Sequence, residues 1–205
     1  MAANFITLEG IEGVGKSTAV AFVMDALKRL GVDAVSTREP GGTPTAERIR
    51  ALLLDPDSAI VPDAELLLMF AARAQHIREF IEPKLDAGIT VVCDRFTDAT
   101  FAYQGGGRGI DGKAIETLAR LVHPNTNPDL TLLLDAPIEI AAGRLAERGA
   151  KDRFEREPPD FFERIRQHYL GRAQNEPQRF QVIDARAAKS DVAAQITKAV
   201  QGLYV

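Results

Sequence analysis

Five short runs of apolar and β-branched residues recur along the chain and predict the strands of a sheet. They are Phe5–Leu8, Ala34–Ser36, Ile89–Cys93, Leu130–Leu134 and Phe180–Ile183. The central runs are too continuously apolar for a sheet with one solvated face, which indicates parallel strands buried on both sides.

Segments with the apolar spacing of a helix separate these runs. Ala19–Leu30 ends at Gly31, a natural C-terminal cap. Thr43 and Pro44 have the residue types of an N-cap and a first helical position, which predicts a helix to about Leu54. The other predicted helices are 64–87, which Pro83 bends or breaks, 111–122, 138–148, 160–174 and 190–201.

The alternation of strands and helices predicts an α/β fold with a doubly wound parallel sheet of five strands, flanked by helices on both faces. A length of 205 residues indicates a single domain, 1–205. In such a sheet, ligands bind outside the carboxyl ends of the strands. Gly105–Gly109 and Gly149–Pro159 are predicted to be flexible loops.

Composition narrows the class of protein. The net charge of −4 makes an overall attraction to nucleic acid or to an anionic membrane unfavourable, so a phosphate site has to be local. The longest apolar runs are shorter than the roughly 18 residues of a membrane span. The only cysteine, Cys93, is expected to be a buried structural thiol. These features favour a cytoplasmic protein.

The strongest motif is GIEGVGKST at Gly10–Thr18, which matches G-x-x-x-x-G-K-[ST] between a predicted strand and a predicted helix. Inward-pointing backbone N–H groups, the helix N-terminus and Lys16 together favour a triphosphate, and Ser17 is a candidate Mg²⁺ ligand. The predicted ATP-binding residues are Gly10, Ile11, Glu12, Gly13, Val14, Gly15, Lys16, Ser17 and Thr18. A guanine-reading N-K-x-D stretch does not occur in the chain, so a small kinase is favoured over a regulatory GTPase.

A second anion site is predicted at the end of the third strand, where Asp94 and Arg95 follow the run Ile89–Cys93. Adjacent residues of an extended chain point in opposite directions, so Asp94 could face the waters of a Mg²⁺ ion while Arg95 binds an acceptor phosphate through its fork. A structural salt bridge between the two is the alternative. Two further loops, TREPGGT at Thr37–Thr43 and YQGGGRG at Tyr103–Gly109, are expected at the same sheet edge.

Together with FAAR at Phe70–Arg73 and DRF at Asp94–Phe96, these motifs resemble bacterial thymidylate kinase in order and spacing over nearly the whole chain. The resemblance implies transfer of the γ-phosphoryl group of ATP to dTMP, with Mg²⁺, by a homodimer with a P-loop kinase fold and a mobile lid. It also implies that Glu12 accepts a hydrogen bond from the 3′-hydroxyl group of the nucleotide sugar.

The resemblance further implies a base site. Phe70 would stack on thymine, Arg73 would bind its O4 oxygen, and Tyr103 would crowd the 2′ position. Many relatives space the aromatic residue and the arginine by four, a position that Met69 holds here. The implied dTMP-binding residues are Glu12, Glu39, Pro40, Phe70, Arg73, Arg95, Thr100, Tyr103 and Gln104, and the implied metal ligands are Ser17 and Asp94.

The charged segment 144–157 is the predicted lid. Arginines from a closing loop can stabilise the charge that develops during phosphoryl transfer. The phosphate loop has Gly13 after Glu12 and so offers no arginine of its own, and the resemblance implies that the lid supplies it. Arg153 is the first candidate and Arg148 the second. Lys16 and Arg95 complete the predicted catalytic set.

Alternatives remain at this stage. Another nucleoside monophosphate or deoxynucleoside kinase would share most of these features, and a pocket for one methyl group separates dTMP from dUMP only weakly. A P-loop switch protein that binds nucleotide without transferring phosphoryl is a less favoured alternative, because a protein that only binds nucleotide has no use for an acceptor clamp.

Overall fold

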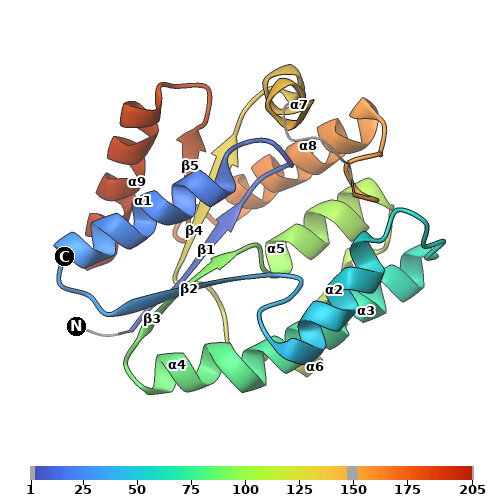
Figure 1. Ribbon diagram of the computed structural model, residues 1–205, viewed down its shortest axis with the longest axis horizontal. Coiled ribbons are helices and arrows are strands. Elements are labelled where there is room, and N and C mark those ends of the chain that lie inside the picture. Colours follow the sequence, from blue (N-terminus) through green and yellow to red (C-terminus); the bar gives the residue numbers. More distant parts are fainter. Residues whose placement is uncertain (1–2, 147–151, 205) are drawn as a thin grey trace.

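The computed structural model describes residues 3–146 and 152–204. A five-stranded parallel sheet with strand order β2-β3-β1-β4-β5 forms its centre (Figure 1). All five predicted strands are present, and their ends differ from the prediction by a residue or two. They are β1 (Phe5–Glu9), β2 (Ala34–Arg38), β3 (Thr90–Asp94), β4 (Leu130–Asp135) and β5 (Phe180–Asp184).

Burial follows the position of each strand in the sheet. β1 is buried along its whole length, and β3 and β4 are buried up to their last residue. The edge strands β2 and β5 carry exposed positions. The continuously apolar runs therefore belong to the three central strands, as two-sided burial requires.

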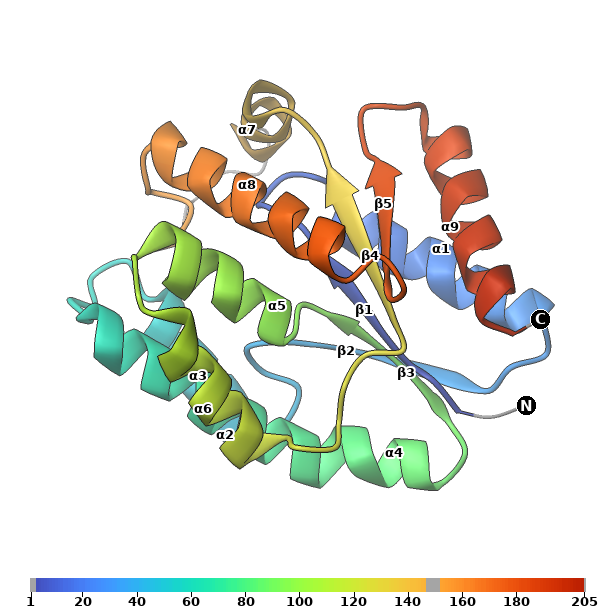
Figure 2. The same cartoon turned by 180° about the vertical axis from the view of Figure 1, so that it is seen from behind.

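Helices cover both faces of the sheet. α1 and α9 pack against each other on one face. The other face is covered by α8 and by the helices from α3 to α6 (Figure 2). The helices before β4 are α1 (Lys16–Arg29), α2 (Pro44–Leu54), α3 (Pro62–His76), η1 (Ile77–Ile81), α4 (Glu82–Asp86), α5 (Thr97–Thr100), η2 (Phe101–Gly107) and α6 (Gly112–Val122). After β4 follow α7 (Ile138–Ala146), α8 (Pro159–Asn175) and α9 (Lys189–Leu203).

Pro83 neither breaks nor ends the long helix that was predicted for 64–87. The chain continues from α3 through the π-helical segment η1 into α4, and Pro83 lies in the first turn of α4. A proline ring collides with the preceding turn of a regular α-helix, and a π-helical turn directly before it widens the helix at that point. The apolar pattern was interpreted correctly, and of the two effects expected of the proline, the break does not occur.

The prediction of a flexible loop at Gly105–Gly109 is wrong. Residues up to Gly107 belong to η2, which packs against α8. A Cβ atom on Gly106 would meet the His168 ring, and one on Gly107 would meet the Phe161 ring. These positions require glycine because two helices approach closely here, not because the backbone has to turn.

The described part of the segment Gly149–Pro159, residues 152–158, forms turns between α7 and α8. Among the helices of the described residues, none combines the length and apolar character that a membrane crossing requires.

Candidate active site

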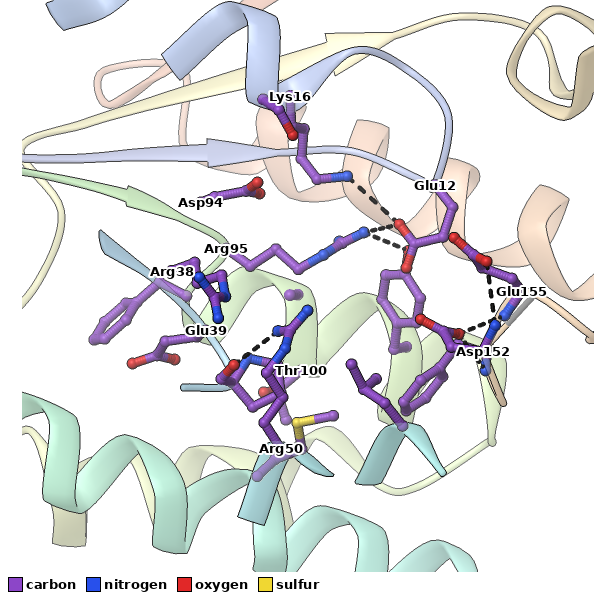
Figure 3. A pocket seen from close by; sticks show the side chains of 18 of the residues that line it. Glu12, Lys16, Arg38, Glu39, Arg50, Asp94, Arg95, Thr100, Asp152 and Glu155 are labelled. Carbon is purple, nitrogen blue, oxygen red and sulfur yellow. Dashed lines mark hydrogen bonds and ion pairs between the residues drawn. The ribbon is translucent and has the colours of Figure 1, made fainter. Parts of the chain in front are cut away.

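A pocket lies at the carboxyl ends of β1, β2 and β3, which is where the sheet topology predicts a ligand site. We call it the strand-end pocket (Figure 3). The predicted residues that line it are Glu12, Gly13, Gly15, Lys16, Ser17, Glu39, Pro40, Arg73, Asp94, Arg95, Thr100, Tyr103 and Gln104. The pocket is also lined by residues that were not among the predicted site residues, namely Arg38, Arg50, Leu54, Met69, Phe96, Ala99, Asp152, Phe154 and Glu155.

The phosphate loop, Gly10–Thr18, connects β1 directly to α1. Gly15 has φ 99° as the N-cap of α1, which begins at Lys16 rather than at the predicted Ala19. Gly13 has φ 78°, and a Cβ atom there would collide with the carbonyl oxygen of Ala141 in α7. The close approach of α7 thus explains why the position after Glu12 carries no side chain.

Lys16 points into the curve of this loop. Its Nζ donates to the carbonyl oxygens of Gly10 and Ile11 at 3.1 and 2.9 Å and lies 3.5 Å from a carboxylate oxygen of Glu12. Burial, followed by the charge of Arg95, lowers the pKa of Lys16. A bound polyphosphate would favour the charged ammonium form, because it adds negative charge next to Lys16.

Arg95 joins the phosphate loop to the rest of the pocket. Its Nη1 donates to the carbonyl oxygen of Gly10 at 2.9 Å, its Nη2 donates to the Tyr103 hydroxyl at 3.0 Å, and its guanidinium forms an ion pair with Glu12. Figure 3 shows Lys16 and Arg95 converging on the Glu12 carboxylate. Burial raises the pKa of Glu12, but Arg95 and Lys16 outweigh it, so the net pKa is lowered.

The expected geometry of the Asp94–Arg95 pair is corrected by the structure. β3 ends at Asp94, and Arg95 has φ 71° rather than an extended conformation. Among the described residues it is the only one other than glycine with a positive φ. A side chain in the left-handed region is strained, and such strain persists where the surroundings hold the residue in place. Both side chains consequently line the same pocket instead of facing opposite ways.

Glu9, the last residue of β1, holds the backbone next to Arg95, and sequence reasoning did not single it out. It is fully buried, its Oε1 accepts the backbone N–H of Phe96 at 2.7 Å, and its Oε2 accepts the Tyr169 hydroxyl at 2.7 Å. That hydroxyl in turn accepts from Nη1 of Arg95 at 3.3 Å. Burial, followed by the nearby Asp98 carboxylate, raises the pKa of Glu9 to about 8.

Asp94 and Ser17 have the donor chemistry of a magnesium site. Both line the strand-end pocket, and the buried Oδ1 of Asp94 has no hydrogen-bond partner. A buried carboxylate oxygen without a partner is costly, so a ligand that supplies positive charge or a coordinated water fits here. Within the described residues, no group of three or more metal-binding side chains occurs. Mg²⁺ commonly binds through one or two protein oxygens plus phosphates.

Arg73 and Thr100 form a polar wall on the side of the pocket made by α3 and α5. Arg73 donates through Nε to Glu39 at 2.7 Å, through Nη1 to Thr100 at 3.0 Å and through Nη2 to the carbonyl oxygen of Phe96 at 3.1 Å. His76 also contacts Glu39, at 3.0 Å. Burial opposes the charged form of Glu39, yet Arg73 and the His76 contact lower its pKa overall. The arginine is therefore fixed in orientation before any ligand binds.

Phe70 does not face the pocket, which corrects the stacking role that the resemblance implied. It is 3% exposed, packs with Leu66 and Ile115 in the core against α6, and lies under the Arg73 guanidinium at 4.9 Å. Met69, one position earlier on α3, lines the pocket instead. The spacing of three residues to Arg73 places Phe70 on the buried side of α3.

Tyr103 and Gln104 come from η2, the helix that was not predicted. Tyr103 lies between the Arg95 guanidinium, 4.8 Å from its ring centre, and the ring of Phe154. Gln104 is 1% exposed and donates to Glu65 at 2.8 Å. Both side chains line the pocket, as expected.

Two further arginines line the pocket: Arg50 was missed in the sequence, and Arg38 was quoted only as part of the TREPGGT loop. Arg50 on α2 donates to the carbonyl oxygen of Pro40 at 2.8 Å, and Arg38 ends β2. Burial and the charges of Arg38 and Arg95 lower the pKa of Arg50. The clustering of these like charges marks an anion site. A search of the helix after TREPGGT for a basic residue facing the sheet edge could have found Arg50.

The first candidate lid arginine, Arg153, is not brought to the pocket. Arg148 lies outside the described residues. Arg153 does not line the strand-end pocket. It donates through Nε to the carbonyl oxygen of Leu53 at 2.9 Å and pairs through Nη1 with Glu65 at 2.7 Å. Of the predicted phosphate-loop residues, Gly10, Ile11, Val14 and Thr18 contribute to the loop without lining the pocket.

Comparison with known proteins agrees with this geometry. The family model described as thymidylate kinase matches residues 8–196. The chain is 59% identical to a thymidylate kinase from Chromohalobacter salexigens over 95% of each chain. It is 56% identical to one from Chromobacterium violaceum, covering 94% of this chain and 91% of the relative. A crystal structure of thymidylate kinase from Ehrlichia chaffeensis is 33% identical and superposes with a TM-score of 0.79, covering 98% of this chain and 99% of the other. This chain therefore belongs to the thymidylate kinase family.

Proposed function

We propose that the strand-end pocket performs the family's reaction by binding ATP on the phosphate loop and dTMP against the wall formed by Arg73 and Thr100. The protein is an enzyme that phosphorylates dTMP. The proposal concerns which residues act: the γ-phosphoryl group of ATP passes to the phosphate of dTMP, giving dTDP and ADP.

One observation carries this assignment. Arg95 donates to the carbonyl oxygen of Gly10, so its guanidinium lies beside the phosphate loop and also lines the strand-end pocket. An acceptor phosphate bound by Arg95 would lie next to the terminal phosphate of a nucleotide on the loop. Positioning of this kind supplies most of the catalysis in phosphoryl transfer, because little covalent chemistry falls to the protein.

The other charged groups fit this placement. Arg38 and Arg50 add positive charge on the acceptor side, and Lys16 adds it on the donor side. Arg95 and Lys16, now paired with Glu12, would exchange its carboxylate for phosphates, and Glu12 would then become available to a sugar hydroxyl. The pocket is therefore electrostatically satisfied by its own residues without ligand and by phosphates with it.

The polar wall supports a pyrimidine with a C4 oxygen as the acceptor base. Arg73 retains N–H donors beyond the three hydrogen bonds that fix it, and Thr100 and Gln104 line the same side. A base that leaves such buried groups unpaired is rejected by about 1–3 kcal/mol for each group. We place the Met69 side chain, not Phe70, against the base.

Ser17 and Asp94 would hold Mg²⁺. When bound, the ion would neutralise charge on the transferring phosphates. The partnerless Oδ1 of Asp94 supports this assignment. We further propose that residues 1–205 form one cytoplasmic domain that acts as a homodimer. Exposed leucines on three neighbouring helices support the dimer, namely Leu52 on α2, Leu67 on α3 and Leu121 on α6.

A coupled assay of ADP release with ATP and Mg²⁺ tests the assignment. Turnover is expected with dTMP, less with dUMP, and far less with dCMP, dAMP or dGMP. Comparable turnover with dCMP would contradict the role of Arg73 and Thr100. A lack of dTMP-dependent turnover would contradict the assignment as a whole and favour a nucleotide-binding switch protein.

A further inference from the structure

A cluster of charged side chains around one buried carboxylate lies beside the strand-end pocket, and none of these charged groups is used in the reaction described above. Its centre is Glu65 on α3, which is fully buried. The Glu65 carboxylate accepts from Gln104 Nε2 at 2.8 Å, pairs with Arg153 Nη1 at 2.7 Å and pairs with Arg108 Nη2 at 3.3 Å. Arg108 also pairs with Glu157 at 2.6 Å. We call these five residues the Glu65 cluster.

The cluster connects two parts of the molecule that are distant in sequence. Arg153 and Glu157 belong to the segment 152–157, and Gln104 belongs to the polar side of the pocket. Two carboxylates and two guanidinium groups balance one another, as buried charges require. A single carboxylate on α3 thus determines where a pocket residue and this segment lie.

The Arg153 guanidinium is not placed to contact a phosphate in the strand-end pocket. Its backbone N–H donates to the carbonyl oxygen of Leu54 at 3.3 Å, its Nε donates to that of Leu53 at 2.9 Å, and its Nη1 is paired with Glu65. The remaining Nη2 is buried without a hydrogen-bond partner. All of these contacts dock the segment onto the end of α2 and onto α3.

Docking places the neighbours of Arg153 in the pocket. Asp152, Phe154 and Glu155 line it, and the Phe154 ring packs edge-on against Tyr103 with ring centres 6.0 Å apart. Oδ1 of Asp152 accepts the backbone N–H groups of Phe154 and Glu155 at 2.9 and 3.0 Å, which makes the segment a compact turn. The position of these three pocket residues therefore depends on the contacts of Arg153.

We propose that Arg153 is a positioning residue whose ion pair with Glu65 anchors the segment 152–157 over the dTMP side of the pocket. The same carboxylate orients Gln104 toward the base, so dTMP binding and docking of the segment reinforce each other. This inference rests on the proposed placement of dTMP. It replaces the expectation that Arg153 acts on the transferred phosphoryl group.

Steady-state kinetics of four variants test the anchor. Arg153→Met and Glu65→Gln are each expected to raise the KM for dTMP about tenfold or more, because small displacements of positioning groups are costly, while kcat at saturation changes little. The double variant is expected to match the single variants, since residues in one interaction do not act additively. Arg156→Met, at an exposed position of the same segment, is the matched control and should leave both constants unchanged.

A second measurement reads the docking without activity. Hydrogen exchange at the amides of Phe154 and Glu155 should slow when dTMP binds the unaltered protein, and this slowing should be much smaller in Glu65→Gln. Arg153→Lys keeps the positive charge and should therefore show more of this slowing than Arg153→Met does. A large fall in kcat in Arg153→Met with an unchanged KM would overturn the anchor, as would effects that multiply in the double variant.

Failure of the anchor is distinguishable from failure of the proposed dTMP site. Thr100→Val probes the site itself, because Thr100 lines the pocket and is not part of the Glu65 cluster. If Thr100→Val raises the KM for dTMP while Arg153→Met and Glu65→Gln leave it unchanged, only the anchor is wrong. If none of the three raises it, dTMP binds elsewhere.

Discussion

The carboxyl group of Glu9 accepts the backbone N–H of Phe96 at 2.7 Å. This bond fixes the residue directly after Arg95, whose own N–H donates to the carbonyl oxygen of Leu8 at 2.9 Å. Two consecutive residues at the end of β1 thus hold the backbone on either side of the strained Arg95. The arginine that joins the two halves of the pocket is oriented from the neighbouring strand.

Glu9 should make stability depend on pH. Its pKa is about 8 in the folded protein against an ordinary value of 4.5, so the folded state binds more protons than the unfolded state between these values. The free energy of unfolding should fall as pH rises through this window. The charged and titratable groups around Glu9 are Asp98, Arg95, Tyr169, Lys16, Cys93 and Tyr103.

Urea denaturation of the unaltered protein and of Glu9→Gln from pH 4.5 to about 8 checks this prediction. The variant cannot titrate at this position and should show a flatter dependence of the free energy of unfolding on pH. Equal pH slopes in the two proteins would show that Glu9 has an ordinary pKa.

Arg95→Met should lower kcat/KM for dTMP by about 10²–10³, because it removes a charged donor placed beside the transferring phosphate. Arg95→Lys should recover only a small part of the loss, since an ammonium group cannot form the two parallel hydrogen bonds of a guanidinium. Steady-state kinetics with varied dTMP measures both variants. If Arg95→Lys retains full activity, paired hydrogen bonding to the acceptor phosphate is wrong.

Thr100→Val should raise the KM for dTMP by an amount equivalent to about 1–3 kcal/mol, because it leaves a buried donor of Arg73 without its partner. Thr97→Val is the matched control. Thr97 is also a buried threonine, but its hydroxyl forms a hydrogen bond with His123 Nε2 at 2.7 Å, and the residue does not line the pocket. The control should lose stability in thermal denaturation and keep its KM for dTMP. An equal rise in KM in both variants would indicate a general structural effect.

Met69 and Phe70 should separate binding from stability. Met69→Ala should weaken dTMP binding in titration calorimetry with little change in stability, because Met69 lines the pocket and is partly exposed. Phe70→Ala should cost about 3–5 kcal/mol of folding free energy, because it removes a buried ring. The milder Phe70→Leu should still bind dTMP. Loss of binding in Phe70→Leu with unchanged stability would restore Phe70 as the stacking residue.

Gly13→Ala should abolish ATP binding and destabilise the fold, because the new Cβ atom collides with the backbone of α7 and the residue has a positive φ. Gly143→Ala, within α7 itself, provides the contrast. A Cβ atom at Gly143 meets nothing, so alanine should stabilise its helix by about 0.5–1 kcal/mol. Thermal denaturation with and without ATP compares the two. Tight ATP binding by Gly13→Ala would show that α7 moves away readily.

The sequence was sufficient for the five strands and for the phosphate loop, because both depend on local signals. Two-sided burial produces continuous apolar runs, and the glycine-rich loop needs specific residue types at fixed spacing. The sequence was misleading where packing between distant segments determines the local structure. The glycines of η2 were interpreted as part of a flexible loop, whereas their small size serves contact with α8. Pro83 was expected to bend or break a helix that η1 allows to continue.

Side-chain direction was the other source of error. The position of Phe70 relative to Arg73 indicated the same helix face, but the spacing alone did not tell which of Met69 and Phe70 points to the pocket. Arg50 lacked a motif, and the partners of Arg153 on α2 and α3 lie roughly a hundred residues earlier in the chain. In the sequence, Glu9 is one more residue at the end of a strand, and its contacts with Phe96 and Tyr169 are what distinguish it.

The most direct test is a crystal structure of the protein with dTMP and a non-hydrolysable ATP analogue. We expect the Arg95 guanidinium to bind the phosphate of dTMP while the triphosphate occupies the phosphate loop and the base lies against Arg73 and Thr100. A structure in which the dTMP phosphate lies out of reach of Arg95, with that guanidinium still paired to Glu12, would contradict the proposed mechanism.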